Sequence, residues 1–193
     1  MTNSFDVGKW PPPACSQIQL FRKSYADKQM PRLDHLKDVL TYKLGSIASF
    51  RGILFVQQRV MTHILEHIIK NDKLLSTMLS VVTLYAHASP ATPSFRLTKA
   101  DVKQNLHKFA SGEANLLIST VVAEEGMDIP AANCVICFDP VLNTVYFNQG
   151  RGRARQQGSS FVIMSEQDGR SAEALARAEQ QQLNSSEFST YCT

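Results

Sequence analysis

A cluster of three arginines is the most distinctive chemical feature of this sequence. Arg151, Arg153 and Arg155 lie within five residues, in the segment Gln149-Gly-Arg-Gly-Arg-Ala-Arg155. Each guanidinium is a planar fork of N–H donors that fits phosphate oxygens, and three such cations repel one another unless anions lie nearby. The two glycines allow a ligand or a second domain to approach closely. The pattern predicts a phosphate-binding segment, and the alternative is an exposed basic loop.

A second polar segment lies where a short apolar run ends. Ser119 and Thr120 follow Leu116-Leu-Ile118, and a turn of helix is expected next. Free backbone amides at the start of a helix, together with two hydroxyls, form a natural phosphate site. Asp128, which follows Gly126, is a candidate to accept a ribose hydroxyl or to fix an arginine. The alternative is that the two hydroxyls merely cap the helix.

The rest of the sequence predicts the scaffold that must position these segments. Five apolar runs of strand length alternate with stretches of helical pattern. The expected strands are 52–56, 79–85, 116–119, 134–138 and 160–164, and the expected helices are 31–45, 58–70, 98–112, 143–155 and 170–183. Pro31 suits a helix start, Thr98 suits a helix cap, and Gly45 and Gly112 are the expected helix ends.

This alternation predicts the class of fold. Strands that are apolar throughout and alternate with helices form a mainly parallel sheet covered on both faces. With right-handed crossovers, the result is a three-layer Rossmann-like α/β domain. Ligands of such sheets bind beyond the carboxyl ends of the strands, which is where both polar segments are expected.

Composition and charge exclude several classes of protein. The 193 residues are 44% hydrophobic and 19% charged, with a net charge of +3, which is typical of a globular protein. No window approaches 18 uninterrupted apolar residues, and the first residues lack the apolar core of a secretory signal, so we expect no membrane contact. The four cysteines are irregularly spread, which favours an intracellular, cytoplasmic or nuclear, location. Because the net charge is small, the arginine cluster predicts an anionic ligand at one place.

Two patterns that suggest a metal are better explained by packing. His63-Ile-Leu-Glu-His67 matches an inverted zinc-hydrolase motif, which would use His63, Glu66 and His67, but no third ligand is evident. Cys134 and Cys137 point to opposite faces if they lie on a strand, and no second cysteine pair lies at metal-ligand spacing. We therefore expect no metal site, a helix that covers the sheet, and two buried cysteines.

The two polar segments together resemble motifs of superfamily 2 helicases. The segment Leu116-Leu-Ile-Ser-Thr-Val-Val-Ala-Glu-Glu-Gly-Met-Asp-Ile-Pro130 resembles motif V of the double-stranded-RNA branch, which includes Dicer helicases and RIG-I-like receptors. Gln149–Arg155 resembles motif VI, and Arg51–Arg59 resembles motif IV. Ala86–Ser89 sits where the branch has a Gly-His motif, although alanine replaces the glycine. The resemblance runs from about residue 31 to 166 and is closest to Dicer-like enzymes.

This resemblance implies the second RecA-like domain of an RNA helicase. The implied organisation is a linker at 1–30, the RecA-like domain at 31–166, and a C-terminal helix and tail at 167–193. In the family, ATP and Mg²⁺ are held mainly by the first RecA-like domain, through a Walker A loop and an acidic motif. The present sequence has neither a Walker A pattern nor an Asp-Glu pair. It is therefore not expected to hydrolyse ATP alone.

The resemblance also implies roles for individual residues. Arg153 and Arg155, helped by Gln149, would reach the β- and γ-phosphates of ATP and neutralise charge on the transferred phosphoryl group. The residues implied on the nucleotide side are Gly126, Asp128 and Arg151. The residues implied to contact the RNA backbone are Ser119, Thr120, Gln57, Gln58, Arg59, His87 and Ser89. Such contacts read the shape of the RNA rather than its sequence.

The expected function is therefore half of a motor. The chain would act in an ATP-dependent double-stranded-RNA helicase or translocase, of a Dicer-like RNA-silencing enzyme. Its partners would be double-stranded RNA and the first RecA-like domain of the same protein. The alternative is an ATP-independent module of the same fold that binds RNA or a protein.

Overall fold

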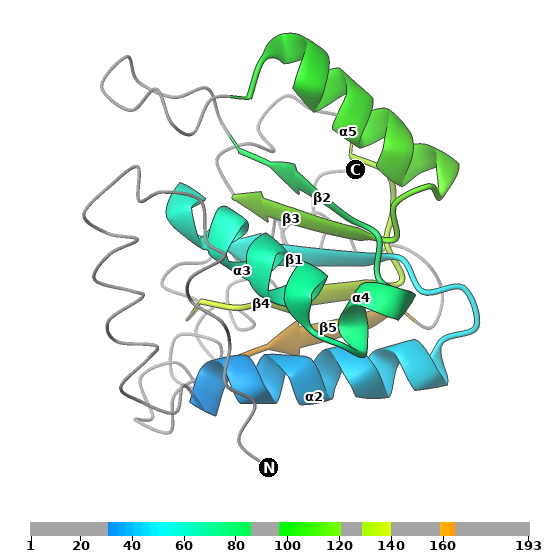
Figure 1. Cartoon of the computed structure of the whole chain (residues 1–193). Helices are drawn as coiled ribbons and strands as arrows, with labels where there is room; N and C mark the ends of the chain where they lie inside the picture. The colour runs from blue at the N-terminus through cyan, green and yellow to red at the C-terminus, as the bar shows by residue number, and fades with distance from the viewer. Residues whose placement is uncertain (1–30, 86–96, 121–128, 140–158, 165–193) are drawn as a thin grey trace, which may run out of the picture.

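A five-stranded parallel sheet forms the centre of the molecule (Figure 1). The structure, a computed structural model, describes residues 31–85, 97–120, 129–139 and 159–164. The strands are β1 (Gly52–Val56), β2 (Val81–Leu84), β3 (Leu116–Thr120), β4 (Cys134–Cys137) and β5 (Ser160–Ile163). Their order in the sheet is β2-β3-β1-β4-β5, and all four pairings are parallel. Each run that the sequence predicts as a strand is therefore a strand, within two residues at its ends.

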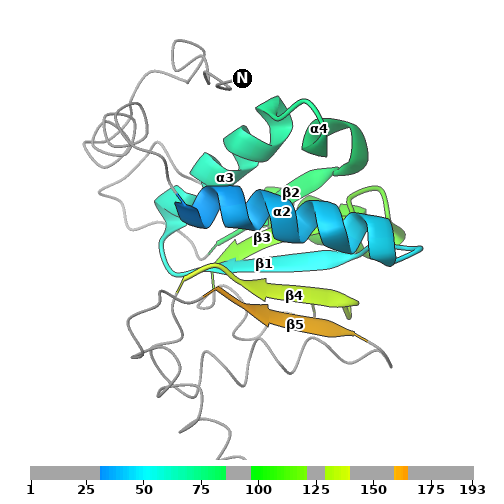
Figure 2. The same cartoon turned by 90° about the horizontal axis from the view of Figure 1, so that it is seen from below.

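The described helices cover both faces of this sheet. They are α2 (Pro31–Ser46), α3 (Arg59–Asn71), α4 (Leu75–Met78) and α5 (Lys99–Ser111). Figure 2 shows α2, α3 and α4 together on one face, and α5 packs on the other through its buried Phe109. The predicted three-layer α/β fold is confirmed. The predicted helices at 143–155 and 170–183 lie outside the described residues.

Two apolar cores explain why the strands are hydrophobic along their whole length. Alternate residues of β1 point to opposite faces, so Leu54 joins the core beneath α2 and α3, whereas Ile53 and Phe55 join the core beneath α5. Every residue of β1, β2, β3 and β4 is buried, and β5, at the edge, is half-buried. A parallel sheet that is covered on both sides needs this composition.

The helix ends follow the local sequence closely. Thr98 forms a reciprocal capping box with Asp101 at the start of α5, and Gly112 ends that helix with a φ of 83°. Both were predicted from residue type. Helix α2 runs one residue past Gly45, whose Cα faces open space. The four-residue helix α4 was not predicted.

Two asparagines align the amino-terminal edge of the sheet. Asn133 accepts the backbone N–H of Arg51 at 2.9 Å and donates to the carbonyl of Ser49 at 2.6 Å. Asn115 makes the same pair of contacts with Ser80 and Met78. Each asparagine precedes a strand and satisfies backbone groups just before the neighbouring strand. These contacts help to set the strand register, and the same register aligns the carboxyl ends of the strands at the opposite edge of the sheet.

Candidate functional site

The carboxyl ends of the central strands meet at one edge of the sheet. Val56 of β1 lies beside Thr120 of β3, and Phe55 lies beside Cys137 of β4. Because β1 lies between β3 and β4, the residues that follow it have a neighbouring strand on each side. The segments that resemble motifs IV and V therefore begin at adjacent points of this edge.

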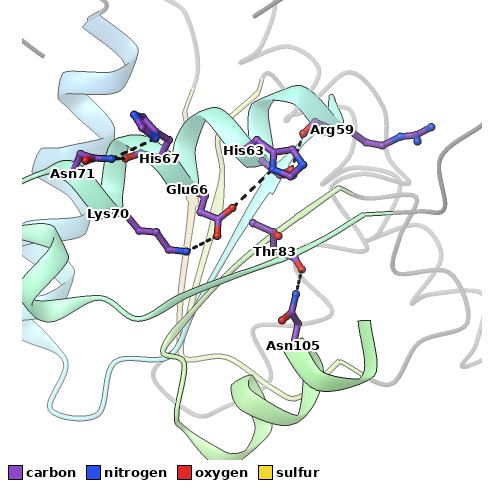
Figure 3. A network of polar contacts seen from close by, with 9 residues as sticks. Arg59, His63, Glu66, His67, Lys70, Asn71, Thr83 and Asn105 are labelled. Carbon is purple, nitrogen blue, oxygen red and sulfur yellow. Dashed lines mark hydrogen bonds and ion pairs between the residues drawn. The ribbon is translucent and has the colours of Figure 1, made fainter. Parts of the chain in front are cut away.

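The loop from β1 into α3 presents polar groups to solvent. Gln57 and Gln58 are exposed, and Arg59 is half-buried as the first residue of α3. Figure 3 shows the Arg59 side chain directed away from the helix. Gln58 occupies the cap position without capping the helix through its side chain, and the first turn holds no acidic residue. The amide end of α3 thus carries a partial positive charge that the Gln58 side chain does not cap.

Ser119 and Thr120 lie within β3 rather than beyond it. The strand extends to Thr120, one residue past the predicted end, and both residues are buried. The Ser119 hydroxyl donates to the carbonyl oxygen of Thr120 at 3.1 Å. The interpretation of these two residues as helix caps concerns residues 121–128, which lie outside the described part of the chain.

Asp139 belongs to this edge and was not predicted. It lies two residues past the end of β4, and its Oδ2 atom accepts the backbone N–H of Gln57 at 2.6 Å. Burial raises the pKa of this carboxyl, whereas the Gln57 hydrogen bond and the Arg32 guanidinium act to lower it. The signal was present in the sequence, because an acidic residue immediately after an apolar strand falls at the edge where ligands bind.

The His63–His67 pattern forms a network of polar contacts on α3 (Figure 3). Glu66 Oε1 pairs with Lys70 Nζ at 2.7 Å, and its other oxygen lies 3.9 Å from His63 Nδ1. The His63 ring packs edge-on against Tyr85, with 5.1 Å between ring centroids. Within the described ranges, no three His, Cys, Asp or Glu side chains are placed to hold a metal ion.

The two β4 cysteines lie in the core, as predicted. Cys134 joins the apolar core beneath α2 and α3, and Cys137 joins the core beneath α5. Burial raises the pKa of the Cys134 thiol to about 11. A thiol in this environment stays protonated near neutral pH and packs as a small apolar side chain.

Protonation of His63 should destabilise the fold. Burial lowers the pKa of His63 below its usual value of 6.5, although Glu66 opposes the shift. The unfolded chain therefore binds this proton more readily, so stability is full above pH 6.5 and falls as the pH drops through the folded-state pKa. We expect His63→Gln to flatten the dependence of the unfolding free energy on pH between 7 and 5, measured by urea denaturation. Parallel curves for the two proteins would contradict this assignment.

Several predicted site residues fall outside the described part of the chain. They are His87, Ser89, Gly126, Asp128, Gln149, Arg151, Arg153 and Arg155. Of the predicted RNA-facing residues, Gln57, Gln58, Arg59, Ser119 and Thr120 are described, and all five lie at the same edge.

In the described part of the chain, no helix has the length and apolar character needed to cross a membrane.

Comparison with known families identifies the domain to which the chain belongs. The model of the helicase conserved C-terminal domain matches residues 32–158, which is well over half of the chain. The chain belongs to this helicase family. The matched range includes the β1–α3 loop, all of β3 and β4, and the arginine cluster.

Relatives of this helicase domain include Dicer proteins and an RNA helicase. The chain is 40% identical over 116 residues, 58% of its length, to Dicer-like protein 2 of Neurospora crassa. It is 34% identical over 71% of its length to Protein Dicer of Schizosaccharomyces pombe, and 29% identical over 72% to mouse ATP-dependent RNA helicase DHX58. The predicted resemblance to the Dicer-like branch of superfamily 2 is confirmed. The chain covers only 8%, 10% and 21% of these three proteins.

Solved structures support the fold of the helicase domain. The C-terminal domain of the DEAD-box protein Dbp5 aligns with a TM-score of 0.56 at 22% identity, covering 75% of this chain and 76% of that domain. A structure of the Escherichia coli DEAD-box protein SrmB aligns with a TM-score of 0.59 at 21% identity, covering 75% of this chain and 79% of the chain in that structure. At this identity the likeness concerns the fold, which is the predicted RecA-like arrangement.

Proposed function

We propose that this helicase domain is the second RecA-like half of an ATP-dependent double-stranded-RNA helicase or translocase of the Dicer type. The observation that carries the proposal is the matched helicase domain, whose β1–α3 loop and β3 end lie side by side at the carboxyl edge of the sheet. The similarity to Dicer proteins and to an ATP-dependent RNA helicase supports RNA as the ligand. The first RecA-like domain would be the partner that closes on this edge.

The described part of the edge supports contact with an RNA backbone. The amide end of α3 and the Arg59 guanidinium attract phosphates. The side-chain amides of the exposed residues Gln57 and Gln58 can donate to phosphate or ribose oxygens. Helix α5 differs, because its amide end is closed by Thr98 and Asp101. Since Ser119 and Thr120 are buried, their share in RNA binding would come mainly through the backbone at the end of β3.

The ATP role would belong to the arginine cluster and to the residues after β3. Arg153 and Arg155, with Gln149 and Arg151, would approach the nucleotide from this domain, whereas ATP and Mg²⁺ would be held mainly by the partner domain. Gly126 and Asp128 would face the same nucleotide. The positive charge of the cluster fits stabilisation of the transferred phosphoryl group.

Replacing Arg59 by Ala tests the RNA-binding half of the proposal. We expect the affinity of the chain for a short RNA duplex to fall roughly twofold to fivefold, the range of a partly exposed ion pair. The loss should be the same for unrelated sequences, and the slope of log K against log salt should fall by about 1. Fluorescence anisotropy at several salt concentrations measures both quantities.

The matched control removes a cation elsewhere. Lys103 is exposed on α5, on the other face of the sheet, so Lys103→Ala should leave the affinity unchanged. Equal weakening by both variants would indicate nonspecific attraction, and an unchanged affinity for Arg59→Ala would contradict the role of the β1–α3 loop. RNA binding that persists in a protein without any ATP-dependent step would favour the alternative of a plain binding module.

A further inference from the structure

We propose that Asp139 is a positioning residue that fixes the β1–α3 loop for RNA binding. This inference rests on the proposed RNA contact of that loop, and it assigns to Asp139 no contact with RNA itself. The residue lies at the carboxyl end of β4, next to the central strand from which the loop emerges.

The hydrogen bonds between β1 and β4 end in this side chain. The Phe138 backbone N–H donates to the carbonyl of Phe55 at 2.9 Å, as expected between parallel strands. The amide of Gln57, one residue past the end of β1, donates to the Asp139 carboxylate at 2.6 Å. The side chain thus extends the pairing by one residue beyond the strands. As a result, the first residue of the loop is tied to the sheet.

The direction of α3 depends on that first residue. Gln58 adopts an extended backbone with φ of −106° and ψ of 135°, and α3 begins at the following residue. Only Gln58 separates the fixed amide of Gln57 from the helix. A carboxylate that holds this amide therefore sets where the open amide end of α3 and the Arg59 side chain point.

The charges around Asp139 fit a positioning role better than a direct one. A carboxylate repels RNA phosphates, so its presence beside an anion-binding loop needs a separate reason. Arg32, in the first turn of α2, lies with its guanidinium carbon 5.9 Å from the centre of the Phe138 ring and attracts the Asp139 charge. Asp139 therefore joins the start of α2, the end of β4 and the β1–α3 loop.

Three substitutions separate the acceptor from the charge. Asp139→Asn keeps a carbonyl oxygen that can accept the Gln57 amide, Asp139→Leu keeps the approximate size without an acceptor, and Asp139→Ala removes both. Asp101→Asn is the matched control, because Asp101 also accepts a backbone N–H, that of Thr98, but on α5. Each 193-residue variant is examined by amide hydrogen exchange at Gln57, RNA-duplex affinity and thermal midpoint.

We expect Asp139→Leu and Asp139→Ala to speed exchange of the Gln57 amide at least tenfold and to weaken RNA binding about threefold to tenfold. Asp139→Asn should restore both quantities to within about twofold, and Asp101→Asn should change neither. Near-normal values in Asp139→Asn distinguish positioning from general destabilisation. If destabilisation were the cause, the loss of RNA affinity would follow the loss of thermal midpoint across the variants rather than the loss of the hydrogen-bond acceptor.

The possible failures are distinguishable. Unchanged Gln57 exchange in Asp139→Ala would overturn the assignment, as would faster exchange with unchanged RNA affinity while Arg59→Ala still weakens binding. If the unaltered chain binds no RNA, the proposed function of the loop fails and this inference fails with it. If the chain binds RNA but Arg59→Ala has no effect, the loop is not the RNA site, whatever Asp139 does to Gln57.

Discussion

Replacing Arg153 by Ala is expected to abolish RNA-stimulated ATP hydrolysis in a protein that joins this domain to a first RecA-like domain. The guanidinium is proposed to neutralise charge that develops on the γ-phosphoryl group during transfer. An arginine in this role contributes roughly 10³–10⁵ in rate, so turnover should fall by about that factor. Steady-state phosphate release with saturating double-stranded RNA measures the effect.

RNA binding separates this loss from a general defect. The affinity for RNA should stay within a few-fold, because Arg153 is assigned to the nucleotide and the β1–α3 loop to RNA. Lys103→Ala, which removes a cation from exposed α5, should leave both turnover and affinity unchanged. Unchanged turnover in Arg153→Ala would refute the assigned role. A loss of RNA affinity as large as the loss of turnover would indicate that Arg153 binds RNA rather than the nucleotide.

Replacing Phe55 by Ala should produce a large loss of stability. Phe55 is 1% exposed in the central strand β1 and belongs to the core beneath α5. Removing a buried phenyl ring from such a site costs about 3–5 kcal/mol through lost burial and the cavity that remains. Urea denaturation of the variant and of the unaltered protein measures the change in unfolding free energy, provided that the two transitions have the same m-value.

An exposed aromatic residue provides the control for that experiment. Tyr42 is 70% exposed on α2 and lies beside Lys43, so Tyr42→Ala should change the unfolding free energy by no more than about 1 kcal/mol. If Phe55→Ala proved as mild as Tyr42→Ala, the central strand would not be packed between two helical layers as described.

The order of strands and helices could be predicted because each element carries its own local signal. The run Gly52-Ile-Leu-Phe-Val56 is apolar along its whole length, as a strand buried on both faces requires. Thr98 and Gly112 delimit α5 through a capping box and a positive φ, which depend on the type of these two residues.

The contacts that depend on register could not be predicted in the same way. Asn133 and Asp139 each hold a backbone amide of a segment more than 80 positions away, so their roles appear only once β1 and β4 are paired. The burial of Ser119 and Thr120 has the same origin, because the strand continues through both hydroxyl residues. Helix α4 is too short, at four residues, to show a helical period.

The most direct test is a structure of the two-domain protein with double-stranded RNA and a non-hydrolysable ATP analogue. The measured quantities are the distances from the Arg153 and Arg155 guanidinium nitrogens to the β- and γ-phosphate oxygens. We predict hydrogen-bond distances of about 2.7–3.2 Å, with Arg59 and the amide end of α3 against RNA phosphates. Guanidinium groups that face away from the nucleotide, or RNA bound on a face remote from the β1–α3 loop, would contradict it.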